Sequence, residues 1–201
     1  NDGSGAITDS NTNVVALSIN DAPIVGGFTA VTTINDTATA TPFASFTLSD
    51  ADFGPQNQTI TVTLDNPLKG IFTPASLGGG IYIPATGTYS FTGTPAAAQA
   101  AIRGLVFDPT DNRVAVGSTE TTIFTVSVTD GSVVTPITNT ATTVVSTSVN
   151  DAPVIIAGAG AAGQAVNDNA TISPFTGYTL TDADNPAQTQ TLTVALDNAA
   201  K

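Results

Sequence analysis

An internal repeat constrains this sequence more than any other feature. The tetrapeptide Asn-Asp-Ala-Pro occupies residues 20–23 and returns at residues 150–153. The segment FTLSDADFGPQNQTITVTLDN at 46–66 returns at 178–198 as YTLTDADNPAQTQTLTVALDN. One copy of such a repeat has the length of a typical domain. The chain is therefore predicted to consist of tandem copies of one domain.

The repeat predicts three parts. Residues 1–19 are expected to be the C-terminal strand of one copy, because an Asp-Gly pair precedes each copy of the tetrapeptide at a similar distance. Residues 20–149 are expected to form a complete domain, and residues 150–201 the N-terminal part of the next. On this interpretation the sequence is a segment of a longer repeat protein.

The composition excludes several classes of function. Lys and Arg together number 4, against 16 acidic residues of which all but Glu120 are Asp, and the net charge is -12. So few basic residues cannot neutralise a run of phosphates, and no nucleic-acid partner is expected. The absence of His and Cys removes most zinc sites, thiol chemistry, disulfides and His-based acid–base catalysis. No enzyme is predicted, and no stretch approaches the ~20 apolar residues of a membrane span.

Alternation of apolar and polar residues predicts antiparallel β-strands. Apolar side chains alternate with Thr and Ser in the most regular runs, which gives each strand one apolar and one wet face. About seven such strands predict an all-β sandwich. They are expected near 23–34, 43–49 and 59–64, within 71–92, and near 104–107, 121–129 and 137–149. One short helix is predicted at 95–103, because Thr94 can cap it, Pro95 suits its first turn and Gly104 can end it.

The aspartates are expected to gather at the two ends of this sandwich. Successive antiparallel strands alternate in direction, so the loops that join them alternate between the ends. One end, called the upper end, is predicted to carry Asn20, Asp21, Asp50, Asp52 and Asp130. The opposite, lower end is predicted to carry Asp36, Asp108, Asp111, Asn150 and Asp151, facing Asp182 and Asp184 of the next copy.

Ca²⁺ is the cofactor predicted at both ends. Carboxylates gathered in one place repel one another unless a cation neutralises them. Ca²⁺ takes ~6–8 oxygen ligands from carboxylates, amides and carbonyls, whereas Mg²⁺ demands a tighter octahedron and keeps more water. Asp65 and Asp197 are instead expected to be structural residues of a turn, because each is followed by Asn and then by a lysine.

Two segments resemble parts of the cadherin repeat. Residues 46–64 resemble the segment that bears the Asp-x-Asp calcium motif, and residues 124–153 resemble the last two strands and the linker that follows. The resemblance implies tandem cadherin-like (immunoglobulin-like Greek-key) sandwiches with Ca²⁺ between them. The residues that match the family's calcium ligands by position are Asn20, Asp21, Asp50, Asp52, Asp130, Asn150, Asp151, Asp182 and Asp184.

The chain departs from animal cadherins in its linkers and in its middle. Ser18 and Ser148 stand where the family has Asp, and residues 107–113 replace the family's Asp-Arg-Glu loop. Fewer than three ions per junction are therefore expected. Residues 87–110 resemble instead the near-identical cadherin-like repeats of giant bacterial surface proteins, including RTX-type adhesins.

This resemblance implies a Ca²⁺-rigidified structural extender repeat of a large secreted or cell-surface bacterial adhesin. Its partners would be the neighbouring repeats of the same chain, and its location would be extracellular. Two alternatives remain open. The repeats could associate side by side into a filament or a surface layer, or the sandwich could bind surface glycans. Against the second, Trp is absent, and a carbohydrate site would want exposed aromatic rings for stacking.

Overall fold

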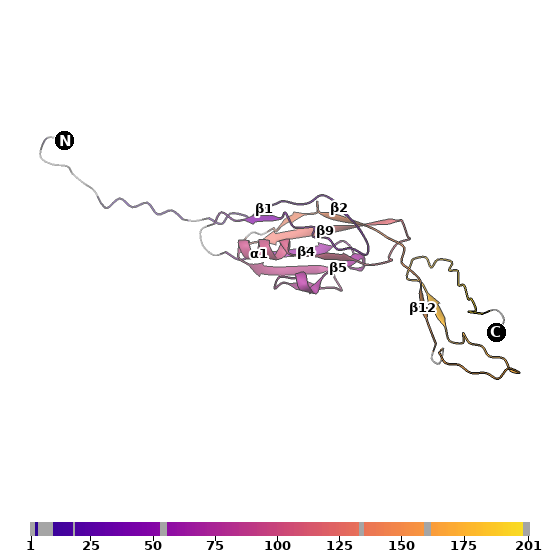
Figure 1. The fold of residues 1–201 in the computed structure, drawn as a ribbon. Coiled ribbons are helices and arrows are strands. Elements are labelled where there is room, and N and C mark those ends of the chain that lie inside the picture. Colours follow the sequence, from indigo (N-terminus) through magenta and orange to yellow (C-terminus); the bar gives the residue numbers. More distant parts are fainter. Residues whose placement is uncertain are drawn as a thin grey trace.

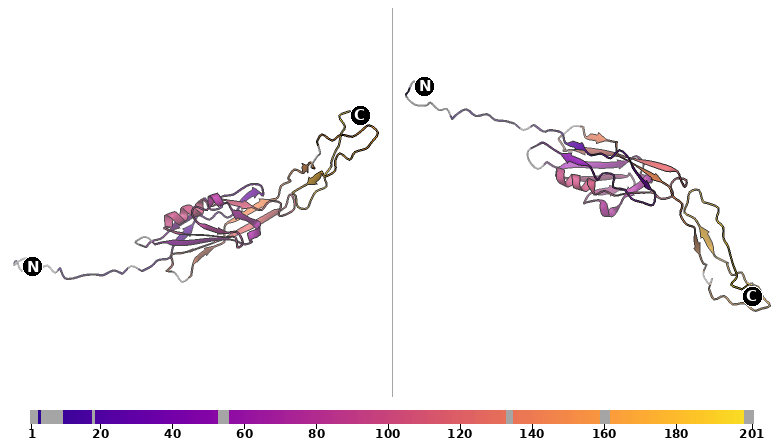
Figure 2. Two further views of the ribbon diagram at one scale, coloured as in Figure 1. Left: turned by 90° about the horizontal axis from the view of Figure 1, so that it is seen from below. Right: turned by 45° about the horizontal axis from the view of Figure 1, so that its top comes forward.

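The structure is a computed structural model, and it describes residues 3, 10–17, 19–52, 56–132, 135–158 and 162–198. The predicted all-β class is confirmed: thirteen β-strands and one α-helix are found among the described residues. Residues 10–17 leave one end of the central sandwich, and residues 150–158 and 162–198 leave the opposite end (Figures 1 and 2). Within the part of the chain that the structure describes, no helix has the length and apolar character needed to cross a membrane.

The larger sheet is built around a long central strand. Its strands lie in the order β2 (Thr32–Asn35), β11 (Thr143–Thr147), β9 (Thr119–Thr129), β4 (Gln58–Leu64), β7 (Thr88–Gly93) and β6 (Ile81–Ile83), with β10 (Ile137–Asn139) also paired to β9. β2 and β11 run parallel, and the other pairs are antiparallel. β9 is long enough to pair with β11 through its first half and with β4 through its second half.

A second layer covers one face of this sheet. It contains two short ladders, β1 (Ile24–Gly26) with β3 (Thr47–Ser49) and β5 (Gly70–Phe72) with β8 (Phe107–Pro109). An isolated bridge between Ala40 and Phe107 adds a further antiparallel contact to this layer. Two single-turn 3₁₀ helices, Pro67–Lys69 and Pro74–Ser76, flank β5.

The hydrophobic core fills the space between the two layers. The alternation seen in the sequence places one face of β4 and β9 inward, so that Ile60, Val62, Phe124, Val126 and Val128 are all buried. Aromatic side chains from the second layer pack on them, with ring centroids 5.1 Å apart for Phe107 and Phe124 and 5.5 Å for Phe43 and Phe124. Burial of this apolar surface is the main term that stabilises the sandwich.

The helix α1 (Pro95–Arg103) lies where it was predicted. The Thr94 hydroxyl accepts a hydrogen bond from the backbone N–H of Ala97 at 3.3 Å, as an N-cap does. Two helix side chains also contact the segment around β3. The side-chain carbonyl of Gln99 accepts from the Leu48 N–H at 2.9 Å, and the Arg103 Nε donates to the backbone carbonyl of Phe46 at 2.6 Å. These helix side chains therefore bond to backbone groups in β3 and in the residues just before it, and in this way the helix covers that edge of the strand.

Three of the predicted strands are divided. The strand expected at 23–34 is two short strands, β1 and β2, which belong to different layers. Gly27 lies between them with φ +68, and a Cβ there would meet the Ser45 carbonyl oxygen at 1.9 Å, so the chain passes too close to Ser45 for any side chain. The strand expected within 71–92 is β5, β6 and β7, and the last predicted strand is β10 and β11.

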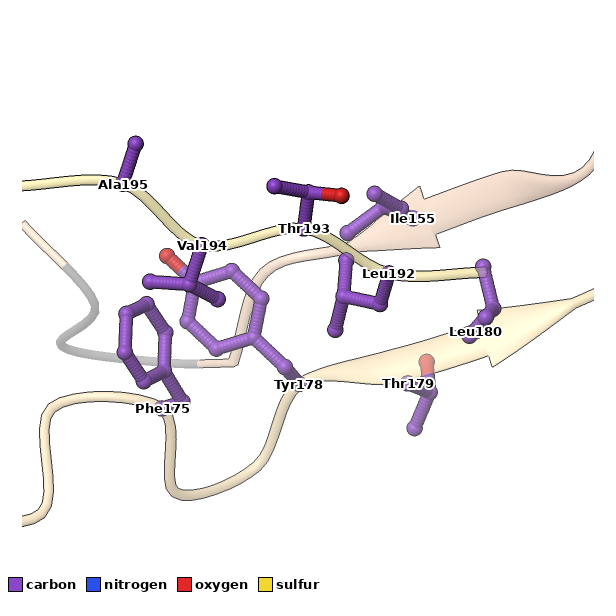
Figure 3. A pocket seen from close by; sticks show the side chains of 9 residues that line it. All are labelled: Ile155, Phe175, Tyr178, Thr179, Leu180, Leu192, Thr193, Val194 and Ala195. Carbon is purple, nitrogen blue, oxygen red and sulfur yellow. The ribbon is translucent and has the colours of Figure 1, made fainter. Parts of the chain in front are cut away.

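The second copy repeats only part of this architecture. β12 (Val154–Ile156) pairs with β13 (Thr179–Thr181) in the register that β1 forms with β3. Residues 190–196, the counterpart of β4, form no strand. The apolar side chains that would build a core instead line an open hollow in Figure 3. The hollow is lined by Ile155, Phe175, Tyr178, Thr179, Leu180, Leu192, Thr193, Val194 and Ala195.

Candidate metal centre

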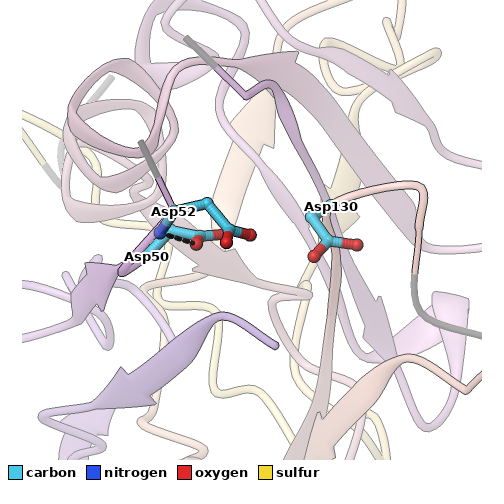
Figure 4. A group of neighbouring side chains, drawn as sticks. All are labelled: Asp50, Asp52 and Asp130. Atoms are coloured by element: carbon cyan, nitrogen blue, oxygen red, sulfur yellow. Dashed lines mark hydrogen bonds between the residues drawn. The ribbon is translucent and has the colours of Figure 1, made fainter. Parts of the chain in front are cut away.

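Three aspartates predicted for the upper end form one cluster. Asp50 and Asp52 lie on the loop after β3, and Asp130 follows the last residue of β9. Oxygen atoms from the three carboxylates lie within 4.8 Å of one another, and Figure 4 shows Asp130 facing the other two across a gap. Because β3 and β9 end on the same side of the sandwich, residues far apart in the sequence contribute to one acidic centre.

The linker residues predicted for this end contact the same cluster. The Asp21 N–H donates to the Asp52 carboxylate at 3.0 Å. The Asn20 side-chain amide donates to the Asp130 carboxylate at 2.8 Å and to the Asp21 carbonyl at 3.0 Å. The structure therefore brings together all five residues that the strand directions assigned to the upper end.

Two glutamines complete the loop, and sequence reasoning missed both. The Gln56 amide donates to the Asp52 carboxylate at 3.1 Å, and the Gln58 amide donates to the Asp50 carboxylate at 2.7 Å. Within the loop, the Asp52 N–H donates to the Asp50 carboxylate at 3.1 Å, which closes an Asx turn. A signal was present in the sequence, because Gln-x-Gln returns at the same distance from the second Asp-Ala-Asp.

At the lower end, one linker aspartate contacts both copies of the repeat. The Asp151 N–H donates to the Asp184 carboxylate of the second copy at 3.0 Å. The Asp151 carboxylate accepts from the side-chain amide of Asn112, which belongs to the preceding sandwich, at 2.7 Å. Asn185 of the second copy also donates to the Arg113 carbonyl at 3.2 Å. The junction is therefore hydrogen-bonded across the linker.

Asp36 bonds to the backbone next to the linker at the lower end of the sandwich. Its carboxylate is buried and accepts from two backbone N–H groups, that of Asn112 at 3.2 Å and that of Val149 at 3.1 Å. Asp36 therefore fixes the loop of Asn112 beside the start of the linker and places a negative charge there.

Asp111 and Asp108 add to the negative charge at the lower end. Partial burial raises the pKa of Asp111, and the charges of Asp36, Asp151 and Asp108 raise it further. Those causes place Asp111 in the field of three other carboxylates. Asp108 itself lies within β8, where it pairs with Ile71, and its predicted place in the following loop was wrong.

The lower loop repeats the hydrogen bonds of the upper loop. The Asp184 N–H donates to the Asp182 carboxylate at 3.0 Å, and the Gln188 amide donates to the Asp184 carboxylate at 3.0 Å. The Gln190 amide donates to the Asp182 carboxylate. The side chain of Asn150 donates to the next carbonyl at 2.8 Å, as that of Asn20 does. With the linker bond to Asp184, five hydrogen bonds recur in the two copies.

Three buried oxygen atoms beside these carboxylates accept no hydrogen bond from any described residue. They are Oε1 of Gln56, Oε1 of Gln58 and Oδ1 of Asn112. An unpaired buried carbonyl oxygen costs free energy, so each is available to a ligand that accepts lone pairs. Carboxylate and amide oxygens together are the donor set that Ca²⁺ prefers, and the residues present therefore fit this ion.

Asp65 plays a different part, as predicted. Its carboxylate pairs with Lys69 at 2.5 Å and accepts from the Ile123 N–H at 3.2 Å. Asp65 therefore supports the turn after β4. In the second copy the matching lysine is Lys201, which would be the partner of Asp197 and lies outside the described residues.

No family model matches the chain, and no curated protein matches its sequence.

Proposed function

We propose that the chain is a structural spacer whose junctions bind Ca²⁺, in the manner of cadherin-like repeats. The upper ligands would be Asp21, Asp50, Asp52 and Asp130 with Asn20. The lower ligands would be Asp36, Asp111, Asp151, Asp182 and Asp184 with Asp108 and Asn150. Neighbouring repeats of one chain are then the principal partners of each domain.

The observation that carries this proposal is the position of Asp151. Its backbone N–H contacts Asp184 of the second copy, and its carboxylate contacts Asn112 of the first. A linker residue that is bonded to both domains can transmit the state of the junction to the angle between them. The charges of Asp36, Asp151 and Asp108 also act on Asp111, so carboxylates repel one another at this end, and a bound cation would remove that repulsion.

The expected consequence is mechanical. Asp36, Asp151 and Asp184 come from the preceding sandwich, the linker and the next copy, so their mutual repulsion favours bent or separated arrangements of the two domains. Bound Ca²⁺ would supply the positive charge that neutralises them. A ligand that binds only the ordered junction stabilises it by ~2.7 kcal/mol when its free concentration is a hundredfold above the dissociation constant.

The proposed Ca²⁺ sites suit a location outside the cell. Extracellular modules bind Ca²⁺ with dissociation constants of ~10⁻⁴–10⁻³ M, so they are saturated only where Ca²⁺ is abundant. We accordingly propose a secreted or cell-surface protein, such as a bacterial adhesin, in which stiff repeats hold a binding region away from the cell. Stiffness, rather than catalysis, would be the property under selection.

Small-angle X-ray scattering with Ca²⁺ and with a chelator tests the spacer function. We expect a longer maximum dimension and a narrower range of bend angles with Ca²⁺, because the junction at Asp151 becomes ordered. The control variant Asp168→Asn removes one negative charge from an exposed position outside both clusters and should respond as the native chain does. Identical scattering in both conditions would contradict a mechanical role for Ca²⁺.

Paired variants test the assignment of ligands to the two junctions. Calorimetric titration of the native chain should give saturable binding at two places. The double variant Asp182→Asn/Asp184→Asn should lose the lower one and keep the upper, and Asp50→Asn/Asp52→Asn should do the reverse. Loss of both by either variant would mean that the loops are wrongly sorted between the two ends.

A further inference from the structure

The buried polar atoms that lack a partner are concentrated at the two junctions. Five such side-chain atoms occur among the described residues, and three of them are the carbonyl oxygens of Gln56, Gln58 and Asn112. A fourth is the Ser148 hydroxyl, two residues before the linker Asn150. A folded domain normally pairs its buried polar groups, so a concentration of exceptions needs a specific explanation.

The three carboxamides share one arrangement. Each donates its NH₂ group to a carboxylate of a junction: Gln58 to Asp50, Gln56 to Asp52, and Asn112 to Asp151. Each leaves its oxygen buried and unpaired on the other side of the same planar group. Gln58 is fully buried, so no solvent reaches its amide to compensate.

We infer that these carboxamides are ligands of the bound ion and that their amide groups reverse when it binds. This inference rests on the proposed Ca²⁺ function and adds to it a set of neutral ligands and a change of state. Without the ion, the NH₂ groups partly neutralise the carboxylates. With the ion, the carbonyl oxygens face it and contribute to its coordination.

Reversal of the amide is a small movement. Rotation about the last side-chain torsion exchanges the positions of the oxygen and the nitrogen, which are nearly equal in size, and leaves the rest of the side chain in place. The hydrogen bond of 2.7 Å from Gln58 to Asp50 shows that one end of this amide already lies at the cluster. The exchange therefore brings the unpaired oxygen to the carboxylates without repacking of the core.

The backbone at Asn112 supports a role beyond packing. It is the one non-glycine residue with positive φ among the described residues, at +53. Backbone strain of this kind persists where the surroundings hold it, and it occurs preferentially at functional sites. Here the strained residue bonds to Asp36 through its N–H and to Asp151 through its side chain, so it connects the preceding sandwich to the linker.

The opposite assignment is that the amide N–H groups of these residues only compete with the ion for the carboxylate oxygens. The two assignments predict opposite changes in Ca²⁺ affinity when the carboxamide is removed. A ligand lost from the site weakens Ca²⁺ binding, whereas a donor that competes with the ion for Asp50 strengthens binding when it is removed. Gln58→Leu removes both polar atoms at nearly constant volume, so the direction of the change in affinity separates the two.

The experiment is NMR of the native chain with ¹³C,¹⁵N-labelled glutamine during a Ca²⁺ titration, together with calorimetry of Gln58→Leu. We expect the side-chain carbonyl resonances of Gln56 and Gln58 to move as the upper site fills. Gln99 is the internal control, because its carbonyl accepts from the Leu48 N–H in α1's contact with β3 and should not respond. Gln58→Leu should weaken Ca²⁺ binding at the upper site, because one ligand oxygen is lost.

Three outcomes separate this inference from the proposed function. Ca²⁺ binding with shifted Gln56 and Gln58 resonances and weaker binding by Gln58→Leu supports both. Ca²⁺ binding with unmoved resonances, or tighter binding by the variant, overturns the ligand role and leaves the spacer function standing. No Ca²⁺ binding by the native chain overturns both. If Gln58→Leu does not fold, the resonances of the native chain still decide.

Discussion

The two copies of segment 46–66 are similar in sequence but share only part of their structure. In both copies the Asp-Ala-Asp loop forms the same hydrogen bonds to its linker and its glutamines. In both, the preceding strand pairs in the same register. The strand after the loop differs. Ile60 and Val62 are 0% exposed in β4, whereas their counterparts Leu192 and Val194 are 60% and 54% exposed and lie in no strand.

The difference shows which part of the repeat is encoded locally. The loop needs only its own side chains, the two glutamines that follow it and the linker, since the hydrogen bonds that recur in both copies join only these residues. β4 is a central strand, held by β7 on one side and β9 on the other. The 201 residues contain one counterpart of β7 and β9, and it serves the first copy. The alternating apolar residues of 190–196 therefore form no strand where neither of the neighbours that hold β4 is present.

The largest expected effect is in hydrogen exchange. Amides of residues 59–64 should exchange through global unfolding, because they lie in the centre of the sheet, whereas amides of 191–196 should exchange almost freely. Core amides open with nearly the full stability of a domain, ~5–15 kcal/mol, so the ratio of protection factors should exceed about a thousandfold. Exchange measured by mass spectrometry or NMR checks this, and similar protection of the two segments would break the comparison.

A grafted chain sharpens the same test. Joining a second copy of residues 67–149 after Asn198 supplies the missing partners, and protection of residues 191–196 should rise towards that of 59–64. As a matched control, joining residues 1–49 instead adds chain without any counterpart of β7 or β9, and protection should stay low.

Core truncation gives the next largest effect. Ile60→Ala removes a buried side chain and should lower the free energy of unfolding of the sandwich by about 2–5 kcal/mol. Leu192→Ala truncates the matching side chain of the second copy, which is exposed. This variant should change the free energy of unfolding by no more than about 0.5 kcal/mol. Urea unfolding of the two variants measures both values. A large loss from Leu192→Ala would mean that the second copy packs a core of its own.

The sequence predicts which residues lie at each end of the sandwich better than it predicts how the strands divide between the two layers. Strand direction alone assigned Asp50, Asp52 and Asp130 to one end, because loops alternate between ends even where strands are divided. The division of strand 23–34 was missed, since the approach of Gly27 to Ser45 is a tertiary contact. A pair of adjacent glycines at 26–27 was the available signal.

The glutamines and Asn112 were missed for a different reason. A carboxamide at a metal site carries no charge, and Gln and Asn are common in loops, so one copy gives no signal. Recurrence of Gln56 and Gln58 as Gln188 and Gln190 does give one, because the strands around them tolerate substitution, such as Ile60 to Leu192, while these positions do not change. Asn112 has no second copy in these residues and required the structure.

A smaller effect is expected at high pH in the complete sandwich. Burial raises the pKa of Tyr89 to about 12, and its hydroxyl donates to the Leu77 carbonyl at 2.9 Å. Its ordinary value is 10.0. Between these values the unfolded chain loses this proton and the folded chain keeps it, so stability is full below pH 10 and falls as pH rises, by at most about 1.4 kcal/mol per pH unit from this residue. In the variant Tyr89→Phe, the free energy of unfolding should fall less steeply with pH between pH 10 and 12. An unchanged slope would mean that Tyr89 ionises in the folded state as it does in the unfolded one.

The smallest effect concerns the loops, where the two copies should behave alike. Asp52→Asn and Asp184→Asn each weaken the bond that a linker N–H makes to the loop, that of Asp21 at 3.0 Å and that of Asp151 at 3.0 Å. A hydrogen bond to a charged acceptor contributes about 1.5–3 kcal/mol and one to a neutral acceptor about 1 kcal/mol, so each substitution should speed exchange of its linker amide by roughly two- to thirtyfold in the presence of a chelator. Equal changes at Asp21 and Asp151 would mean that the loop is stable without the rest of the repeat. A clearly smaller change at Asp151 would mean that its second bond, to Asn112, holds the lower linker in place when the loop is weakened. The junction would then depend on the preceding sandwich as much as on the loop that follows it.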